Sequence, residues 1–249
     1  MRRLMAANWK MYKTSAEAKD TLLLLAELLG NRSPEGREVL VFAPFTALEA
    51  SAEAMRALHG GHVGAQNMYP AMEGAFTGEI SPPMILASGA SWVLIGHSER
   101  RHLLGESDEF IGRKVRLALQ TGLNVMLCVG ETLEEREQGA LAGVLQRQIS
   151  LALEGIEKEA MPHLAVAYEP VWAIGTGKSA SSADIEEAHA LLNQLLEKHF
   201  ETTREIPVLY GGSVKPENAH SILALDNVDG VLVGGASLQA ESFSRIVTA

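Results

Sequence analysis

Short runs of apolar and β-branched residues recur along the chain about every thirty residues, the length of one strand, one helix and two loops. Most of these runs do not alternate between apolar and polar positions, a pattern typical of strands that are covered on both faces of a parallel sheet. The predicted strands are residues 4–9, 38–43, 62–67, 91–96, 124–130, 164–169, 206–212 and 227–235.

Helix-like segments lie between these runs. The clearest are residues 14–30, which end on a glycine, and residues 182–200, where serines precede the first acidic residues. Eight strand–helix units in a chain of 249 residues predict a closed (β/α)₈ TIM barrel. We expect residues 1–249 to form a single domain, because no linker or shift in composition divides them. An open doubly wound sheet is the alternative, but its glycine fingerprint is absent from the first strand–helix turn, NWKMYKT.

The composition limits the possible partners. Asp and Glu number 31 against 21 Lys and Arg, and the net charge of -10 disfavours a nucleic-acid or anionic-membrane surface. The longest apolar stretches reach roughly ten residues, about half the length of a membrane-spanning helix. The single cysteine, Cys128, excludes an internal disulfide, and with no signal peptide evident we expect a cytoplasmic protein.

The stretch VWAIGTGKSA, residues 171–180, contains parts of two nucleotide-binding motifs. A P-loop requires glycine where Trp172 stands, and a dinucleotide fingerprint requires an acidic residue near Leu195, so neither motif is complete. An apolar loop that starts at Pro170 and has glycines at its tip suggests instead a lid that closes over a site. A plain surface loop is the alternative.

Glycine pairs follow the last two predicted strands, at residues 211–212 and 234–235. Glycine lets the backbone approach a ligand closely, and (β/α)₈ barrels often bind phosphate at these two loops. Either pair alone could be a tight turn without a ligand. The predicted phosphate ligands are the backbone amides of Gly175, Ser213, Gly234 and Gly235.

Three ionisable residues stand at predicted carboxyl ends of strands, where barrels build active sites. Glu169 ends the sixth strand, and Lys10 lies just beyond the first, next to Asn8. His97 precedes a possible helix start, and the positive end of a helix dipole favours a neutral imidazole. Taken singly, these residues could also be an exposed glutamate, a solvated lysine and a structural histidine.

Several motifs together resemble the triosephosphate isomerase family. They span residues 4–238 in the family's order and include AANWKM (6–11), GHSERR (96–101), CVGETLEERE (128–137), AYEPVWAIGTGKSA (167–180), YGGSVKPEN (210–218), QN (66–67), GAFTGEISP (74–82) and LVGGASL (232–238). The resemblance implies the reversible interconversion of dihydroxyacetone phosphate and D-glyceraldehyde 3-phosphate, in glycolysis and gluconeogenesis, without a cofactor.

The resemblance also implies a role for each candidate residue. Glu169 moves a proton between two carbons, while a neutral His97, a known feature of the family, polarises the carbonyl and shuttles protons between the oxygens. Lys10 binds the substrate and stabilises the enediolate, with Asn8 as its hydrogen-bonding neighbour. Glu99 supports the site through Lys10.

The segment 67–82 is too long for an ordinary loop and carries the apolar residues Met68, Tyr69, Met72 and Phe76. An exposed apolar loop suggests a partner. In the family that it resembles, this loop inserts into a second subunit, with Thr77 near the partner's site, so we expect a homodimer.

Two departures from the family's pattern are Tyr12, where asparagine is frequent, and Ser179, where threonine is frequent. Neither changes a catalytic group.

Two other functions fit the same residues. A Schiff-base aldolase would use Lys10 as its nucleophile, and a sugar-phosphate binding protein would bind phosphate without turnover. We predict no metal site: His59 and His62 have a metal-like spacing, but zinc normally takes three or four protein ligands. Cys128 is expected to be buried and inert, and Glu131 to support the site or the fold.

Overall fold

The parallel strands follow one another around a closed barrel, and the last strand pairs with the first. The computed structural model describes residues 3–173, 179–202 and 205–249. Within them the strands are β1 (Arg3–Asn8), β2 (Arg37–Ala43), β3 (Gly61–Ala65), β4 (Trp92–Ile95), β5 (Asn124–Val129), β6 (Leu164–Tyr168), β7 (Val208–Tyr210) and β8 (Gly230–Val233). The predicted barrel is confirmed, and the open sheet is excluded because β1 pairs with both β2 and β8.

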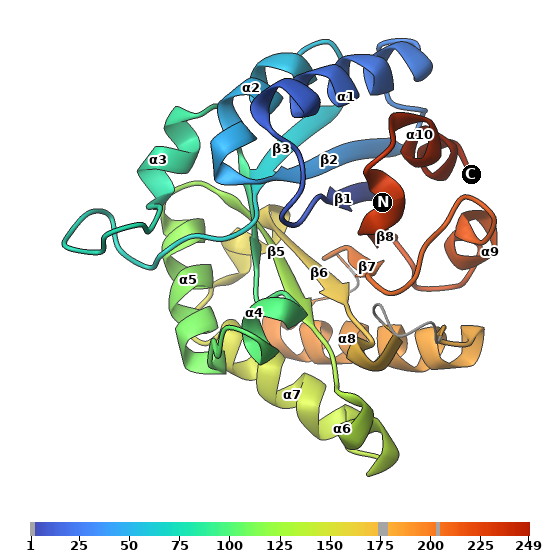
Figure 1. Ribbon diagram of the computed structural model, residues 1–249. Helices are drawn as coiled ribbons and strands as arrows, with labels where there is room; N and C mark the ends of the chain where they lie inside the picture. The colour runs from blue at the N-terminus through green and yellow to red at the C-terminus, as the bar shows by residue number, and fades with distance from the viewer. Residues whose placement is uncertain (1–2, 174–178, 203–204) are drawn as a thin grey trace.

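Helices surround the strands, as Figure 1 shows. The α-helices are α1 (Ser15–Leu28), α2 (Leu48–Met55), α3 (Pro82–Ala87), α4 (Ser98–His102), α5 (Asp108–Gln120), α6 (Leu133–Glu137), α7 (Leu141–Ala152), α8 (Ser182–Phe200), α9 (Ala219–Leu223) and α10 (Ala240–Thr248). Short 3₁₀ helices are η1 (Phe45–Ala47), η2 (Lys158–His163), η3 (Val171–Ala173) and η4 (Gly235–Ser237).

Both faces of the strands are buried, which explains why their sequences do not alternate. Alternate residues along a strand point to opposite faces. One set, which includes Leu40, Phe42 and Met126, forms a small cluster inside the barrel. The other set, which includes Val39 and Val41, packs in the larger cluster between the barrel and the helices.

Local sequence signals mark where the two clearest helices begin and where α1 ends, as the sequence predicts. Thr14 and Glu17 form a capping box at the start of α1, and Gly30 follows its end with a φ of 65°. Ser181 and Asp184 form a second capping box at the start of α8.

The segment between β3 and α3 projects away from the barrel, at the left of Figure 1. Phe76 packs on Tyr69 with ring centroids 4.3 Å apart, while the Met72 side chain is about half exposed. Met68 was expected among the exposed apolar residues, but it is 1% exposed and belongs to the main core, so that part of the prediction is wrong.

No helix in the described part of the chain is long and apolar enough to cross a membrane.

Candidate active site

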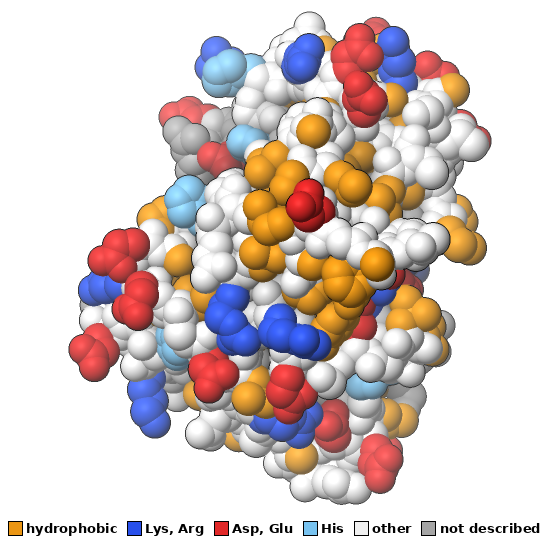
Figure 2. All heavy atoms as spheres, turned by 90° about the vertical axis from the view of Figure 1, so that its left-hand side faces the viewer, with side chains coloured by type: hydrophobic (Ala, Val, Ile, Leu, Met, Phe, Trp, Pro, Cys, Tyr) orange, Lys and Arg blue, Asp and Glu red, His pale blue; other side chains and the backbone are white. Residues whose placement is uncertain are grey.

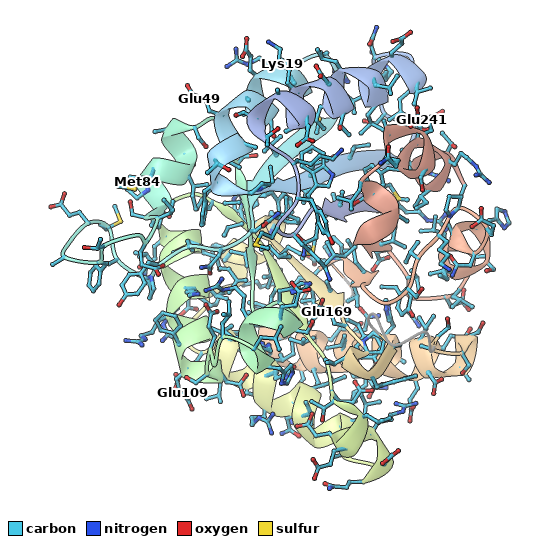
Figure 3. The ribbon with its side chains drawn as sticks, in the orientation of Figure 1. Lys19, Glu49, Met84, Glu109, Glu169 and Glu241 are labelled. Carbon is cyan, nitrogen blue, oxygen red and sulfur yellow. The ribbon has the colours of Figure 1, made fainter. Side chains whose placement is uncertain are left out.

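A cavity of about 290 Å³ lies at the carboxyl ends of the strands. Figure 3 shows Glu169 at the tip of β6, inside the ring of helices, whereas the labelled Glu49 and Glu241 lie on outer helices. The predicted residues that line the cavity are Asn8, Lys10, His97, Glu169, Ser213, Gly234 and Gly235. Gly175, the other predicted phosphate ligand, lies outside the described residues.

Glu169 directly follows β6 and is only 2% exposed. Its Oε2 accepts the backbone N–H of Ser98 at 2.8 Å, and its Oε1 lies 3.0 Å from His97 Nε2. Burial alone raises the pKa of Glu169, but the charge and hydrogen bond of His97 and the Ser98 amide outweigh it and hold the pKa below its usual value. The carboxylate is therefore ionised, and both of its oxygens are engaged by Ser98 and His97.

His97 is the N-cap of α4, the helix start that the sequence predicts. Its Nδ1 accepts the backbone N–H of Glu99 at 3.3 Å, which leaves Nε2 to donate to Glu169. Burial is the largest single influence and lowers the pKa of His97, but the charge and hydrogen bond of Glu169, together with the charge of Glu99, outweigh it and hold the pKa above its usual value. The hydrogen bond from the Glu99 amide opposes protonation of Nδ1, because a protonated Nδ1 could not accept that hydrogen bond.

Lys10 reaches the cavity from the loop after β1. Its backbone N–H donates to Asn8 Oδ1 at 3.0 Å, and its φ of 52° is in the left-handed region that non-glycine residues seldom adopt. Its Nζ donates to Glu99 Oε1 at 2.7 Å, the contact predicted from the sequence. Asn8 and Glu99 thus fix the backbone and the ammonium group of the same lysine.

The loops after β7 and β8 also line the cavity. At Gly212 a Cβ would come within 2.2 Å of the Tyr210 hydroxyl, so only glycine fits beside that ring. At Gly234 a Cβ would lie 3.6 Å from Lys10 Cε, which brings the predicted phosphate loop next to the cation. Lys215 also lines the cavity, and although it stands in the YGGSVKPEN motif, we did not predict it.

Comparison with known proteins identifies the family. The triosephosphate isomerase family model matches residues 3–249. A triosephosphate isomerase of Nitratidesulfovibrio vulgaris is 59% identical, and the alignment covers 100% of both chains. One of Oleidesulfovibrio alaskensis is 57% identical over 100% of both chains. The chain belongs to the triosephosphate isomerase family.

The fold agrees with this assignment. A crystal structure of triosephosphate isomerase from Bartonella henselae superposes with a TM-score of 0.88 at 38% identity, covering 99% of this chain and 98% of that one. The chain is an isomerase of glycolysis that interconverts dihydroxyacetone phosphate and D-glyceraldehyde 3-phosphate, as the sequence motifs predict.

Glu131 contacts residues on both sides of Glu169 in this isomerase. Its carboxylate is 0% exposed and accepts the Tyr168 hydroxyl at 3.0 Å and the Trp172 indole N–H at 2.8 Å. Its backbone oxygen accepts the Val171 N–H at 3.1 Å. Burial raises the pKa of Glu131, and the hydrogen bonds only partly offset this. The sequence indicated a supporting role for Glu131 but not these partners, because Tyr168 lies on β6 and Val171 and Trp172 lie in η3, all far along the chain from Glu131.

Cys128 is buried in the barrel interior, as expected. Burial raises the pKa of its thiol well above the usual value, which keeps the thiol protonated and unreactive. His62 lies 3.6 Å from Glu38. Residues 3–173, 179–202 and 205–249 contain no group of three or more His, Cys, Asp or Glu that could hold a metal ion.

Proposed function

We propose that Glu169, His97 and Lys10 carry out the isomerisation in the 290 Å³ cavity. Glu169 removes a proton from C1 of dihydroxyacetone phosphate, and the C1–C2 enediolate forms. His97 Nε2–H donates to the C2 oxygen and later exchanges a proton with the C1 oxygen. Protonated Glu169 then returns its proton to C2, which gives D-glyceraldehyde 3-phosphate. The Lys10 ammonium group stabilises the negative charge between these steps.

Glu169 has to leave its present partners before it reaches the substrate. In this arrangement its oxygens contact Ser98 and His97, so the carboxylate is stored as an ion rather than presented to the cavity. When it turns away, His97 loses the larger of the two carboxylate charges that raise its pKa, while the Glu99 amide still donates to Nδ1. His97 then becomes the neutral donor that the mechanism requires.

The phosphate group of the substrate binds to the backbone amides of Gly175, Ser213, Gly234 and Gly235. The last three line the same cavity as Lys10, and Gly234 lies next to this lysine, which supports the assignment. Backbone N–H groups suit a dianion in a protein of net charge -10, because they attract it locally without a large basic surface.

Deuterium exchange tests the proton transfer. Wild-type protein incubated with dihydroxyacetone phosphate in D₂O should place deuterium on carbon in both triose phosphates, detected by NMR. Glu169→Gln keeps the shape of the side chain but removes the base, so we expect kcat to fall by about a hundredfold to ten-thousandfold. Inorganic phosphate should inhibit both proteins with similar constants. Equal turnover in the variant would remove Glu169 as the base.

Lys10 is better suited to binding than to Schiff-base chemistry. Its Nζ is an ammonium group paired with Glu99 at 2.7 Å, and it therefore lacks the free electron pair that attack on a carbonyl needs. Borohydride added with substrate should leave Lys10 unmodified, whereas a label on Lys10 in mass spectrometry would favour the aldolase.

We propose further that two copies of the chain form a homodimer through the 67–82 loop. Met72 and Phe76 are exposed on the loop by 51% and 42%. A hollow of about 320 Å³ lies next to the active site, and the apolar residues that line it include Met11, Phe45 and Leu104. The face from which the loop projects is the one in Figure 2, where hydrophobic side chains gather across the middle. The loop of a second copy fits this hollow.

We also assign the protein to the cytoplasm, where glycolytic substrates occur and a reducing medium keeps Cys128 a thiol. The buried Cys128, which forms no disulfide, supports this assignment.

A further inference from the structure

Arg136 lies on α6, outside the cavity, and its guanidinium group contacts three separate parts of the chain. Nη1 is 3.8 Å from Glu131 Oε1, and the guanidinium carbon lies 5.9 Å from the centre of the Trp172 ring. Nη2 pairs with Asp184 Oδ1 and lies 3.2 Å from Glu187 Oε2, both on α8. One side chain therefore connects the segment after β5 and the segment after β6 to the start of α8.

On one side, Arg136 acts on the surroundings of Glu169. Its partner Glu131 accepts hydrogen bonds from Tyr168, which precedes Glu169, and from Trp172, which follows it. Because burial disfavours an ionised Glu131, the nearby guanidinium helps to keep this carboxylate charged and able to accept both bonds.

On the other side, Arg136 acts on the first turn of α8. Asp184 Oδ2 accepts the backbone N–H of Ser181 at 2.9 Å and its hydroxyl at 2.7 Å, while Asp184 Oδ1 faces Arg136. The carboxylate thus uses one oxygen to cap the helix and the other to bind the guanidinium group. The start of α8 is tied to Glu131 through a single cation.

We propose that Arg136 is a positioning residue for the isomerisation: it holds the chain around Glu169 in register with the start of α8. This inference rests on the proposed role of Glu169 as the base. A base works only when its reacting oxygen is held close to the substrate carbon, and a displacement of about 1 Å costs roughly a hundredfold in rate. Loss of Arg136 also leaves the carboxylates of Glu131, Asp184 and Glu187 together without this cation.

Three variants test the proposal. Arg136→Gln removes the charge, and we expect kcat to fall at least tenfold while the inhibition constant of inorganic phosphate changes less than twofold. Arg136→Lys restores a charge without the planar fork and should recover part of the loss. Asp184→Asn keeps an acceptor for Ser181 but weakens the link to Arg136, and it should lower kcat severalfold.

Glu187→Gln is the matched control. Glu187 pairs with the same guanidinium group but is 62% exposed in its side chain. The cap of α8 is formed by Ser181 and Asp184 rather than by Glu187, so the kcat of Glu187→Gln should stay within twofold of wild type. Circular dichroism shows whether each variant is folded.

Several outcomes would overturn the proposal. A folded Arg136→Gln protein with wild-type kcat overturns it, and so does an equal loss in Glu187→Gln. A phosphate inhibition constant that weakens in parallel with kcat also overturns it, because the whole site is then disturbed. If Arg136→Gln does not fold, Asp184→Asn decides, and unchanged kcat there overturns the proposal. If wild-type protein shows no exchange in D₂O, the proposed function itself fails.

Discussion

At the scale of single residues, the contact between His97 and Glu169 controls the charges in the site. The two side chains are 7% and 3% exposed and their atoms lie 3.0 Å apart. Each shifts the pKa of the other toward the charged form, Glu169 downward and His97 upward. The position of His97 before a helix predicted a neutral ring, but the carboxylate beside it was not visible in the sequence. In the proposed mechanism, the pair stores the base as an ion until substrate separates the two groups.

The pH dependence of stability follows from these directions. Glu169, whose pKa is lowered, contributes stability above its ordinary pKa of 4.5 and loses it as the pH falls through the folded value. His97, whose pKa is raised, contributes stability below its ordinary pKa of 6.5 and loses it as the pH rises through the folded value. The contribution of the pair is therefore complete between pH 4.5 and 6.5.

Urea unfolding of wild type and Glu169→Gln at several pH values, at one protein concentration, measures this contribution. We expect the difference in free energy of unfolding to be largest between pH 4.5 and 6.5 and to shrink on both sides. A difference that stays constant with pH would contradict the ion pair.

At the scale of elements, the ends of β5 and β6 are packed backbone against backbone. The N–H of Glu169 donates to the oxygen of Val129 at 2.8 Å. A Cβ on Gly130 would come within 1.8 Å of the Glu169 carbonyl oxygen, a contact that no side chain can relieve. Glycine at this position lets the segment that follows β5 support the backbone of the proposed base. The packing of these two strand ends therefore fixes the backbone position of Glu169.

Gly130→Ala should move the Glu169 backbone, lower kcat by at least tenfold and reduce the free energy of unfolding by about 1–3 kcal/mol. Gly143→Ala is the matched control. Gly143 lies inside α7, and a Cβ there would meet nothing within 4 Å. That change should leave kcat unaltered and stabilise the protein by about 0.5–1 kcal/mol, because alanine favours a helix. Steady-state kinetics and urea unfolding measure both effects, and equal kcat in the two variants would contradict the argument.

At the scale of the whole molecule, the hollow beside the active site borders the start of the projecting loop, because Gln66 and Asn67 line it. The hollow shares Asn8, Lys10 and His97 with the catalytic cavity. Association of two copies would therefore cover one wall of each site with the partner's loop. Assembly and activity are coupled in this proposal, because dissociation exposes that wall to water.

Phe76→Glu places a charge on the loop and should convert the dimer to a monomer, with a loss of kcat of at least tenfold. Sedimentation velocity measures the oligomeric state. Leu23→Glu on α1 is the matched control, since Leu23 and Phe76 are both 42% exposed. It should leave both assembly and kcat unchanged. A wild-type monomer with full activity, or dissociation by both changes, would contradict the proposed interface.

The sequence alone determined the local structure and most of the candidate site. Apolar runs and helix caps are short-range signals, so they located the strands, the start of α1 and the start of α8. The motifs located Lys10, His97 and Glu169, because parallel strands of a barrel bring their carboxyl ends to one rim. The prediction of a single domain stays untested.

The tertiary structure alone decided which partners each side chain has. Tyr168 and Trp172 meet Glu131 from 37 and 41 positions away in the chain, and Asp184 meets Arg136 from 48 positions away. It also decided that Met68 belongs to the core rather than to the exposed loop. Such contacts depend on the closure of the barrel and the packing between strands and helices, and a local pattern carries no record of either.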